Sequence, residues 1–356
     1  MDFTGDGIND ILSGCYWSQD ENKPGGNPQA GYLMILAGTE EGNFEEASPL
    51  TDPDNNPLLN VKLTKEQEEN YDRNNIEMGN ICTAQHAVDY DGDGDLDLVT
   101  GCFGKSFFVF INSSDDPSIP PAFDSPAQQL SIESPDQHSN PHLYDWDDDG
   151  DLDLLTGGHT GSVYLSINQG TQQEPEWSDF KRLISGSTRY YQSTENGQKI
   201  QPGQASRVWV TDYNRDGRPD LVVGDNVTIQ NKVAGLSQAE FDRRKAGHEK
   251  KMRPLQTKMG EIQLKYVERL EELTRKKETE KVDQLIEKMQ KEMQPFSREF
   301  SQLYQEQSEF VAESRTGHVW VYLQQEGSGS ASKEQTVSTN GSKAEADKDQ
   351  EPDRPL

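Results

Sequence analysis

A thirteen-residue pattern rich in aspartate occurs four times in the sequence, beginning at Asp2, Asp89, Asp145 and Asp212. Every copy has Asp at positions 1, 5 and 9, an aromatic residue at position 2, and Gly at positions 6 and 13. Position 3 adds a further oxygen donor, which is Thr, Asp, Asp and Asn in the four copies. Oxygen donors at alternating positions around a sharp turn are the ligand set that Ca²⁺ prefers. The pattern therefore predicts calcium-binding loops.

The candidate ligands lie at positions 1, 3, 5, 7 and 9, where position 7 would contribute its backbone carbonyl. They are Asp2, Thr4, Asp6 and Asp10 in the first copy; Asp89, Asp91, Asp93, Asp95 and Asp97 in the second; Asp145, Asp147, Asp149, Asp151 and Asp153 in the third; and Asp212, Asn214, Asp216, Arg218 and Asp220 in the fourth. We expect up to four Ca²⁺ ions, one per loop. The first site should be the weakest, because Thr4 replaces a carboxylate there.

The loops differ from the EF-hand, in which position 12 is a glutamate between two helices. Position 12 is Ser13, Thr100, Thr156 or Val223 in this sequence, and no helical pattern flanks the loops. A short apolar run ended by Gly follows position 9 in each copy, which predicts a buried strand. The sequence therefore predicts that each loop joins two strands.

Further strands are predicted on both sides of each loop. Apolar segments follow the position-13 glycine at 31–37, 106–111, 162–167 and 318–323. Segments 84–88, 142–144 and 207–210 would enter the loops, and 177–184 would supply a fourth strand in the third unit. Repeated four-stranded units are typical of a β-propeller. We therefore expect an all-β fold with four propeller blades.

The loop pattern D-x-[DN]-x-D-G-x-x-D, followed by an apolar strand and Gly, resembles the FG-GAP or VCBS repeat family. The resemblance covers roughly residues 1–235 and 316–323 and departs from the family pattern at Thr4 and Asn214. It implies the calcium-binding blades known from integrin α-subunits and bacterial surface proteins. It also implies a bacterial, secreted, periplasmic or cell-surface protein. Family members usually have six to eight blades, so we expect an incomplete ring, with further strands and an export signal upstream of Met1.

Residues 237–314 have a helical pattern instead. Apolar residues recur at steps of three and four, which is typical of a coiled-coil seam, and the two runs mirror each other about residues 277 and 278. This predicts an antiparallel helical hairpin inserted in the fourth blade. The expected domains are blades 1–3 and the first part of blade 4 at 1–236, the hairpin at 237–314, a return strand at 315–323 and a disordered tail at 324–356.

The overall composition excludes several classes of partner. Asp and Glu total 63 against 34 Lys and Arg, a formal charge of −29, which repels nucleic acid and anionic membranes. No apolar run is long enough for a transmembrane segment. Residues 237–314 contain 16 basic and 16 acidic residues, so the rest of the chain carries the whole charge. Cys82 and Cys102 flank the second loop, and their pairing is left open.

No catalytic motif stands out in the sequence. His86 and His142 each lie three residues before a loop, where Trp209 stands in the fourth copy, and we interpret them as packed strand residues rather than metal ligands. Two functions remain. The favoured one is a noncatalytic calcium-binding propeller for binding or adhesion, with the helical hairpin as a protein-docking arm. The alternative is a carbohydrate-active propeller, a lectin, polysaccharide lyase or hydrolase, marked by converging His, Arg, Tyr and carboxylate groups.

Overall fold

The computed structural model describes residues 1–15, 31–62, 78–114, 121–123, 126–187, 189–195, 198–276 and 278–325. The chain forms two compact units: Met1–Tyr190, Gln201–Val227 and the segment from Gly317 make one, and Tyr191–Ile200 and Thr228–Thr316 make the other. The described residues form four β-sheets and two long helices. Neither of these helices has the apolar stretch needed to span a bilayer. The predicted disordered tail lies outside the described residues except for its first two.

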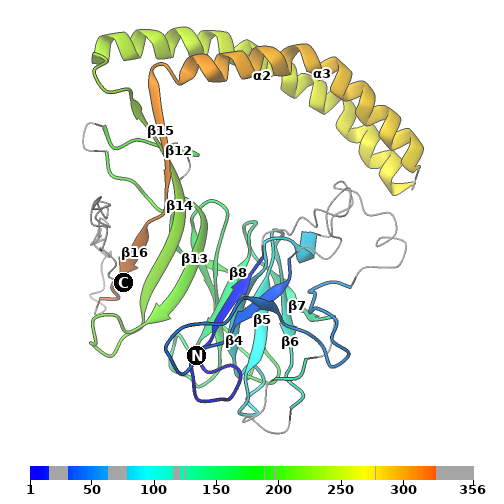
Figure 1. The fold of residues 1–356 in the computed structure, drawn as a ribbon, viewed down its shortest axis with the longest axis vertical. Helices are drawn as coiled ribbons and strands as arrows, with labels where there is room; N and C mark the ends of the chain where they lie inside the picture. The colour runs from blue at the N-terminus through cyan, green and yellow to red at the C-terminus, as the bar shows by residue number, and fades with distance from the viewer. Residues whose placement is uncertain are drawn as a thin grey trace, which may run out of the picture. The chain divides into compact units, whose positions relative to one another are not determined.

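The first three sheets have antiparallel strands that follow one another along the chain (Figure 1). The first contains β1 (Ile11–Gly14), β2 (Leu33–Leu36) and β3 (Ser48–Pro49). The second contains β4 (Ala84–Val88), β5 (Asp97–Gly101), β6 (Ser106–Phe110) and β7 (Gln128–Glu133). The third contains β8 (Asn140–Tyr144), β9 (Asp153–Gly157), β10 (Val163–Ser166) and β11 (Lys181–Ile184). These sheets confirm the strands predicted around the second and third loops.

The fourth sheet is built around one long strand, β14 (Asp220–Lys232). Its first half pairs with β13 (Gln204–Thr211) and β16 (Val319–Tyr322), as the repeat predicts. Its second half pairs with β12 (Tyr191–Gln192), in parallel, and with β15 (Val311–Thr316). The strand was expected to end at Gly224, but the β-branched run Val227–Ile229 favours further extended structure.

The two helices are α2 (Gln238–Arg275) and α3 (Thr279–Gln307). They contact each other with opposite chain directions, since Lys265 Nζ lies 2.8 Å from Glu292 and His248 Nε2 lies 3.0 Å from the Leu303 oxygen. A short 3₁₀ turn at Met78–Asn80 precedes β4 in the other unit. The helical pattern was expected to continue to residue 314, but α3 ends at Gln307 and the return to the sheet begins with β15 at Val311.

Apolar clusters fill the space between successive sheets. Between the first and second sheets, the buried cluster consists of Phe3, Leu33, Leu58, Ala87, Leu98, Phe110 and Phe123. Between the second and third, it consists of Val99, Phe107, Val109, Leu143 and Leu154. Both clusters draw on the runs that follow position 9 of the loops. Burial of these runs therefore fixes the start of β5 and β9, and with it the last residue of each aspartate loop.

A hydroxyl six residues before the loop also joins each sheet to the preceding one. This residue is Thr83, Ser139 or Ser206. Its oxygen accepts the backbone N–H of position 14 in the preceding copy, at 3.2, 2.9 and 2.9 Å, respectively. The repeat therefore encodes contacts between sheets as well as the strands and loops.

Candidate metal-binding loops

The position-1 aspartate closes each loop by accepting backbone N–H groups. Asp89 accepts from Gly92 at 2.8 Å and from Gly94 at 3.1 Å. In the other copies, Asp2 accepts the N–H groups of Gly5 and Gly7, Asp145 those of Asp149 and Gly150, and Asp212 those of Asp216 and Gly217. Gly94 has a φ of 101°, in the region that favours glycine. The glycine at position 6 is therefore explained by the turn itself.

The position-9 aspartate ties the loop to the sheet. In the second copy, Asp97 accepts the N–H of Tyr90 at 2.8 Å with one carboxylate oxygen and the N–H of Asn112 at 2.7 Å with the other. Asp10, Asp153 and Asp220 make the same pair of bonds, to Phe3 and Gly38, Trp146 and Asn168, and Tyr213 and Gln324. All four carboxylates are buried. Position 9 therefore joins the start of the loop to the end of a neighbouring strand, the one that pairs with the strand leaving the loop.

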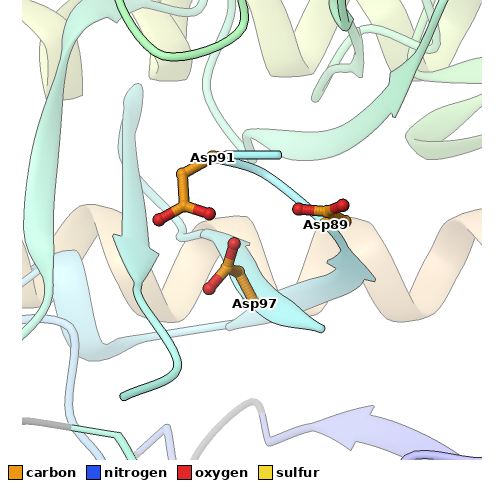
Figure 2. A group of neighbouring side chains, drawn as sticks. All are labelled: Asp89, Asp91 and Asp97. Atoms are coloured by element: carbon orange, nitrogen blue, oxygen red, sulfur yellow. The ribbon is translucent and has the colours of Figure 1, made fainter. Parts of the chain in front are cut away.

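Two loops bring three carboxylates together. In the second loop, Asp89, Asp91 and Asp97 each place an oxygen within 4.8 Å of the others, and Figure 2 shows them pointing toward one another. In the third loop, the group consists of Asp145, Asp147 and Asp149. These are the only such groups among the described residues. An all-carboxylate set is suited to a hard cation such as Ca²⁺ or Mg²⁺.

In the second and third loops, burial of the carboxylates and repulsion between them disfavour the negatively charged forms. Burial raises the pKa of Asp97 and Asp153 to about 6, although backbone N–H donors oppose the effect. Burial and the neighbouring aspartates also raise the pKa of Asp95 and Asp151. Asp95 and Asp151 each have one buried carboxylate oxygen without a hydrogen-bond partner. Oxygens in this state fit a site that takes up a cation.

The first and fourth loops hold their predicted ligands without gathering three carboxylates, in the part of the chain that the structure describes. In the fourth loop, the Asn214 amide and the Arg218 guanidinium both donate to Asp216, and these contacts lower the pKa of Asp216. Arg218 therefore already places a positive charge beside that carboxylate. In the first loop, the Thr4 hydroxyl oxygen is buried without a partner, and Asp6 accepts the N–H of Ile8 at 2.8 Å.

The position-5 aspartates of the second and third loops also bond within their own loop. Asp93 accepts the N–H of Asp95 at 3.1 Å, and Asp149 accepts that of Asp151 at 3.2 Å. Sequence reasoning missed two residues that contact the second loop from another sheet, Gln172 and Gln173. No local sequence signal marks them, because they lie more than eighty residues along the chain.

The histidines before the second and third loops pack between strands. His86 Nδ1 accepts the N–H of Leu143, and His142 Nε2 accepts that of Val210, each at 3.1 Å. Their ring centroids are 4.2 Å apart. Burial lowers the pKa of His86 to about 4, and burial together with the proximity of the His86 ring lowers that of His142 to about 2. Both rings are therefore neutral at physiological pH.

The cysteines form no bridge in the structure: Cys15, Cys82 and Cys102 are all free. Cys102 is buried, and Cys82 and Cys15 are partly buried. Burial raises the pKa of all three thiols, so each is protonated at neutral pH. The region near the second loop therefore offers aspartate oxygens, and no thiolate, to a cation.

Comparison with known proteins gives one family. No curated protein matches the sequence. The family model described as FG-GAP-like repeat matches residues 145–223. This segment begins at the first aspartate of the third loop, includes the whole fourth loop and ends within β14. Residues 145–223 of the chain are therefore similar to an FG-GAP-like repeat.

Proposed function

We propose that the chain is a noncatalytic, calcium-binding β-propeller module that acts in binding or adhesion outside the cytoplasm. The four sheets would be its blades. The observation that carries the proposal is the pair of carboxylate groups in the second and third loops. The FG-GAP-like repeat at residues 145–223 supports both the propeller and the extracytoplasmic setting.

Calcium would act structurally in this module. The second loop would hold it through Asp89, Asp91 and Asp97, and the third through Asp145, Asp147 and Asp149. Each group concentrates negative charge between two paired strands, and a divalent cation would relieve that repulsion. The fourth loop is the weakest candidate, because Arg218 already contacts Asp216. This changes the order expected from ligand counts, which placed the first loop last.

The helical unit supports the docking part of the proposal. Its α2 surface exposes Leu264 at 74% and Val267 at 43%, one turn apart on the helix. Residues 237–314 have balanced charge, whereas the rest of the chain is strongly acidic. A protein partner could therefore approach the helices without the repulsion that the acidic sheets impose.

A carbohydrate-active module is the second candidate. The observation in its favour is the group around His138, whose ring centroid lies 5.0 Å from that of His159. Burial, His159 and Arg207 lower the pKa of His138, and Asp136 opposes them. However, one Asp136 oxygen already accepts both the N–H and the hydroxyl of Thr160 at 2.7 Å, which makes it a poor base. Saturable oligosaccharide binding that H138A abolishes would favour this candidate.

Thermal unfolding tests the calcium proposal. A ligand that binds only the folded state adds about 2.7 kcal/mol per site at a hundredfold excess over Kd. We expect the Tm to fall by several degrees in chelator and to recover when calcium is restored. Asp91→Asn and Asp147→Asn should each reduce that recovery, whereas Asp54→Asn, on an exposed turn, should not. A Tm that is the same in calcium and chelator would overturn the proposal.

A further inference from the structure

The connection between β10 and β11 of the third sheet contacts the aspartate loop of the second sheet. Gln172 Nε2 donates to the backbone oxygen of Asp89 at 2.7 Å. Gln173 Nε2 donates to the backbone oxygen of Asp91 at 3.0 Å. Two consecutive amides therefore hold alternate carbonyl groups of one loop.

These carbonyl groups belong to the residues whose carboxylates meet Asp97. A hydrogen bond to the backbone oxygen restricts the adjoining peptide plane, and with it the direction of the side chain. Gly92, between Asp89 and Asp97, provides the space: an added Cβ there would lie 2.8 Å from Gln173 Nε2. The third loop has Asp148 at this position and the fourth has Arg215. The first loop also has a glycine there, Gly5, but among the described residues only the second loop combines this glycine with side-chain amides bonded from the next sheet.

The connection that carries the two amides is itself held in place. The buried Asn168 side chain accepts the N–H of Gly170 at 3.0 Å and that of Glu176 at 2.9 Å. The Asn168 N–H in turn bonds to Asp153 at 2.8 Å. Trp177 packs in the same apolar cluster as Tyr90, the aromatic residue of the second loop. The amides therefore project from a fixed turn, which lowers the entropy lost when they hold the loop.

We propose that Gln172 and Gln173 are positioning residues that raise the cation affinity of the second loop and couple its occupancy to the third sheet. The proposal rests on the calcium function proposed above. Among the described residues, no side chain donates to the backbone oxygen of Asp145 or Asp147. The third loop therefore serves as an internal comparison, with a similar carboxylate group and no such amides.

Calorimetric titration of calcium into the chelator-stripped full chain tests the affinity. In an Asp147→Asn background, which leaves the second loop intact, Q172A/Q173A should weaken binding about tenfold, as the loss of two modest hydrogen bonds would. The exposed Gln169, on the same connection and without a side-chain bond, gives the control Q169A. In an Asp91→Asn background, Q172A/Q173A should leave the third loop unchanged. If the double variant fails to fold, Q173A alone serves as the test, because Gln173 is exposed and its truncation should not disturb the fold. Q173A should weaken calcium binding about threefold, since it removes one of the two hydrogen bonds.

Hydrogen exchange of residues 168–177 tests the coupling. Calcium should slow exchange in this segment in the unmodified chain and in Asp147→Asn, and the effect should disappear in Asp91→Asn and in Q172A/Q173A. If the chain binds calcium but Q172A/Q173A matches Q169A in affinity and exchange, the positioning role is wrong and the calcium function stands. If the chain binds no calcium at all, the calcium function fails, and this proposal fails with it.

Discussion

Gly101 faces the backbone oxygen of Ser139 so closely that an added Cβ would lie 2.0 Å from that oxygen. Gly101 ends β5 in the second sheet, and Ser139 precedes β8 in the third. Gly14 and Gly157 occupy the same position in their copies, and a Cβ added there would lie 1.8 Å from the Thr83 oxygen and 1.9 Å from the Ser206 oxygen, respectively. In these three copies, the glycine at position 13 is thus required by the neighbouring sheet.

Gly224 is the matched exception, because no described atom lies within 4 Å of its added Cβ. We expect Gly101→Ala and Gly157→Ala to lower the free energy of unfolding by about 1–3 kcal/mol, as forced overpacking does. Gly224→Ala should change it by less than about 0.5 kcal/mol. Urea unfolding in chelator measures all three variants. Equal losses in the three would contradict the contact between sheets as the cause.

The position-9 carboxylate predicts a stability effect that needs no metal. Asp153→Ala would leave the buried N–H of Asn168 and the partly buried N–H of Trp146 without this acceptor. We expect a loss of about 2–4 kcal/mol, since hydrogen bonds to charged groups are worth more than neutral ones. Asp147→Ala, in the same loop but exposed, is the control and should cost little in chelator. The result to check is the urea midpoint, and equal midpoints for the two variants would argue against the tie that Asp153 makes.

The strands that bury apolar runs could be predicted from sequence, and those at polar edges could not. The predicted segment 106–111 agrees with β6 and 162–167 with β10, because a mostly apolar run follows shortly after a glycine in each. β7 was missed, since four of the six residues in its sequence QQLSIE are polar and most of the strand is exposed. The first four residues of β15 (VAESRT) were assigned to the helical insertion for the same reason, and its last two to the return strand.

The spacing of the aspartates in the sequence also predicted the candidate ligands. It did not predict which carboxylates come together in the folded loops. A count of ligands in the sequence assigns the fourth loop three carboxylates and one amide, and therefore predicts a usable cation site. Only the folded loop brings Arg218 against Asp216. The amides of Gln172 and Gln173 reach the second loop through the packing of one sheet on the next. Contacts of this range leave no local pattern in a single sequence.

The neutral pair His86 and His142 predicts a dependence of stability on pH. Their pKa values are about 4 and about 2 in the folded chain, against about 6.5 when unfolded. The unfolded state therefore takes up protons first, so the stability they support is full above pH 6.5 and declines as the pH falls. At pH 5 the loss should be roughly 2 kcal/mol for each histidine.

Asp97 and Asp153 act in the opposite sense, because their pKa values of about 6 are raised above the unfolded value. The test is therefore the difference between the unmodified chain and H86Q/H142Q, measured in chelator from pH 8 to pH 5. The unmodified chain should lose more stability over this range. Parallel curves would show that the two rings do not remain neutral in the fold.

The helical unit should be separable from calcium binding. The carboxylate groups of the second and third loops belong to one compact unit, and α2 and α3 belong to the other. We expect replacement of residues 237–308 by a Gly-Ser linker, which keeps β15, to leave the calcium-dependent rise in Tm unchanged. As a control for the presence of the linker, the same Gly-Ser sequence is inserted after Gly235 in a chain that keeps its helices. Loss of the calcium effect only in the replacement would mean that the helices support the loops.

The most direct test of the calcium account is isothermal titration calorimetry, in which calcium is added to the chelator-stripped full chain. The account predicts saturable heat from the second and third loops, loss of one component in Asp91→Asn and of the other in Asp147→Asn, and no such heat in the double variant. Asp216→Asn should leave both components in place, since Arg218 already contacts that carboxylate. Absence of calcium-dependent heat in the unmodified chain, or its persistence in the double variant, would contradict the account.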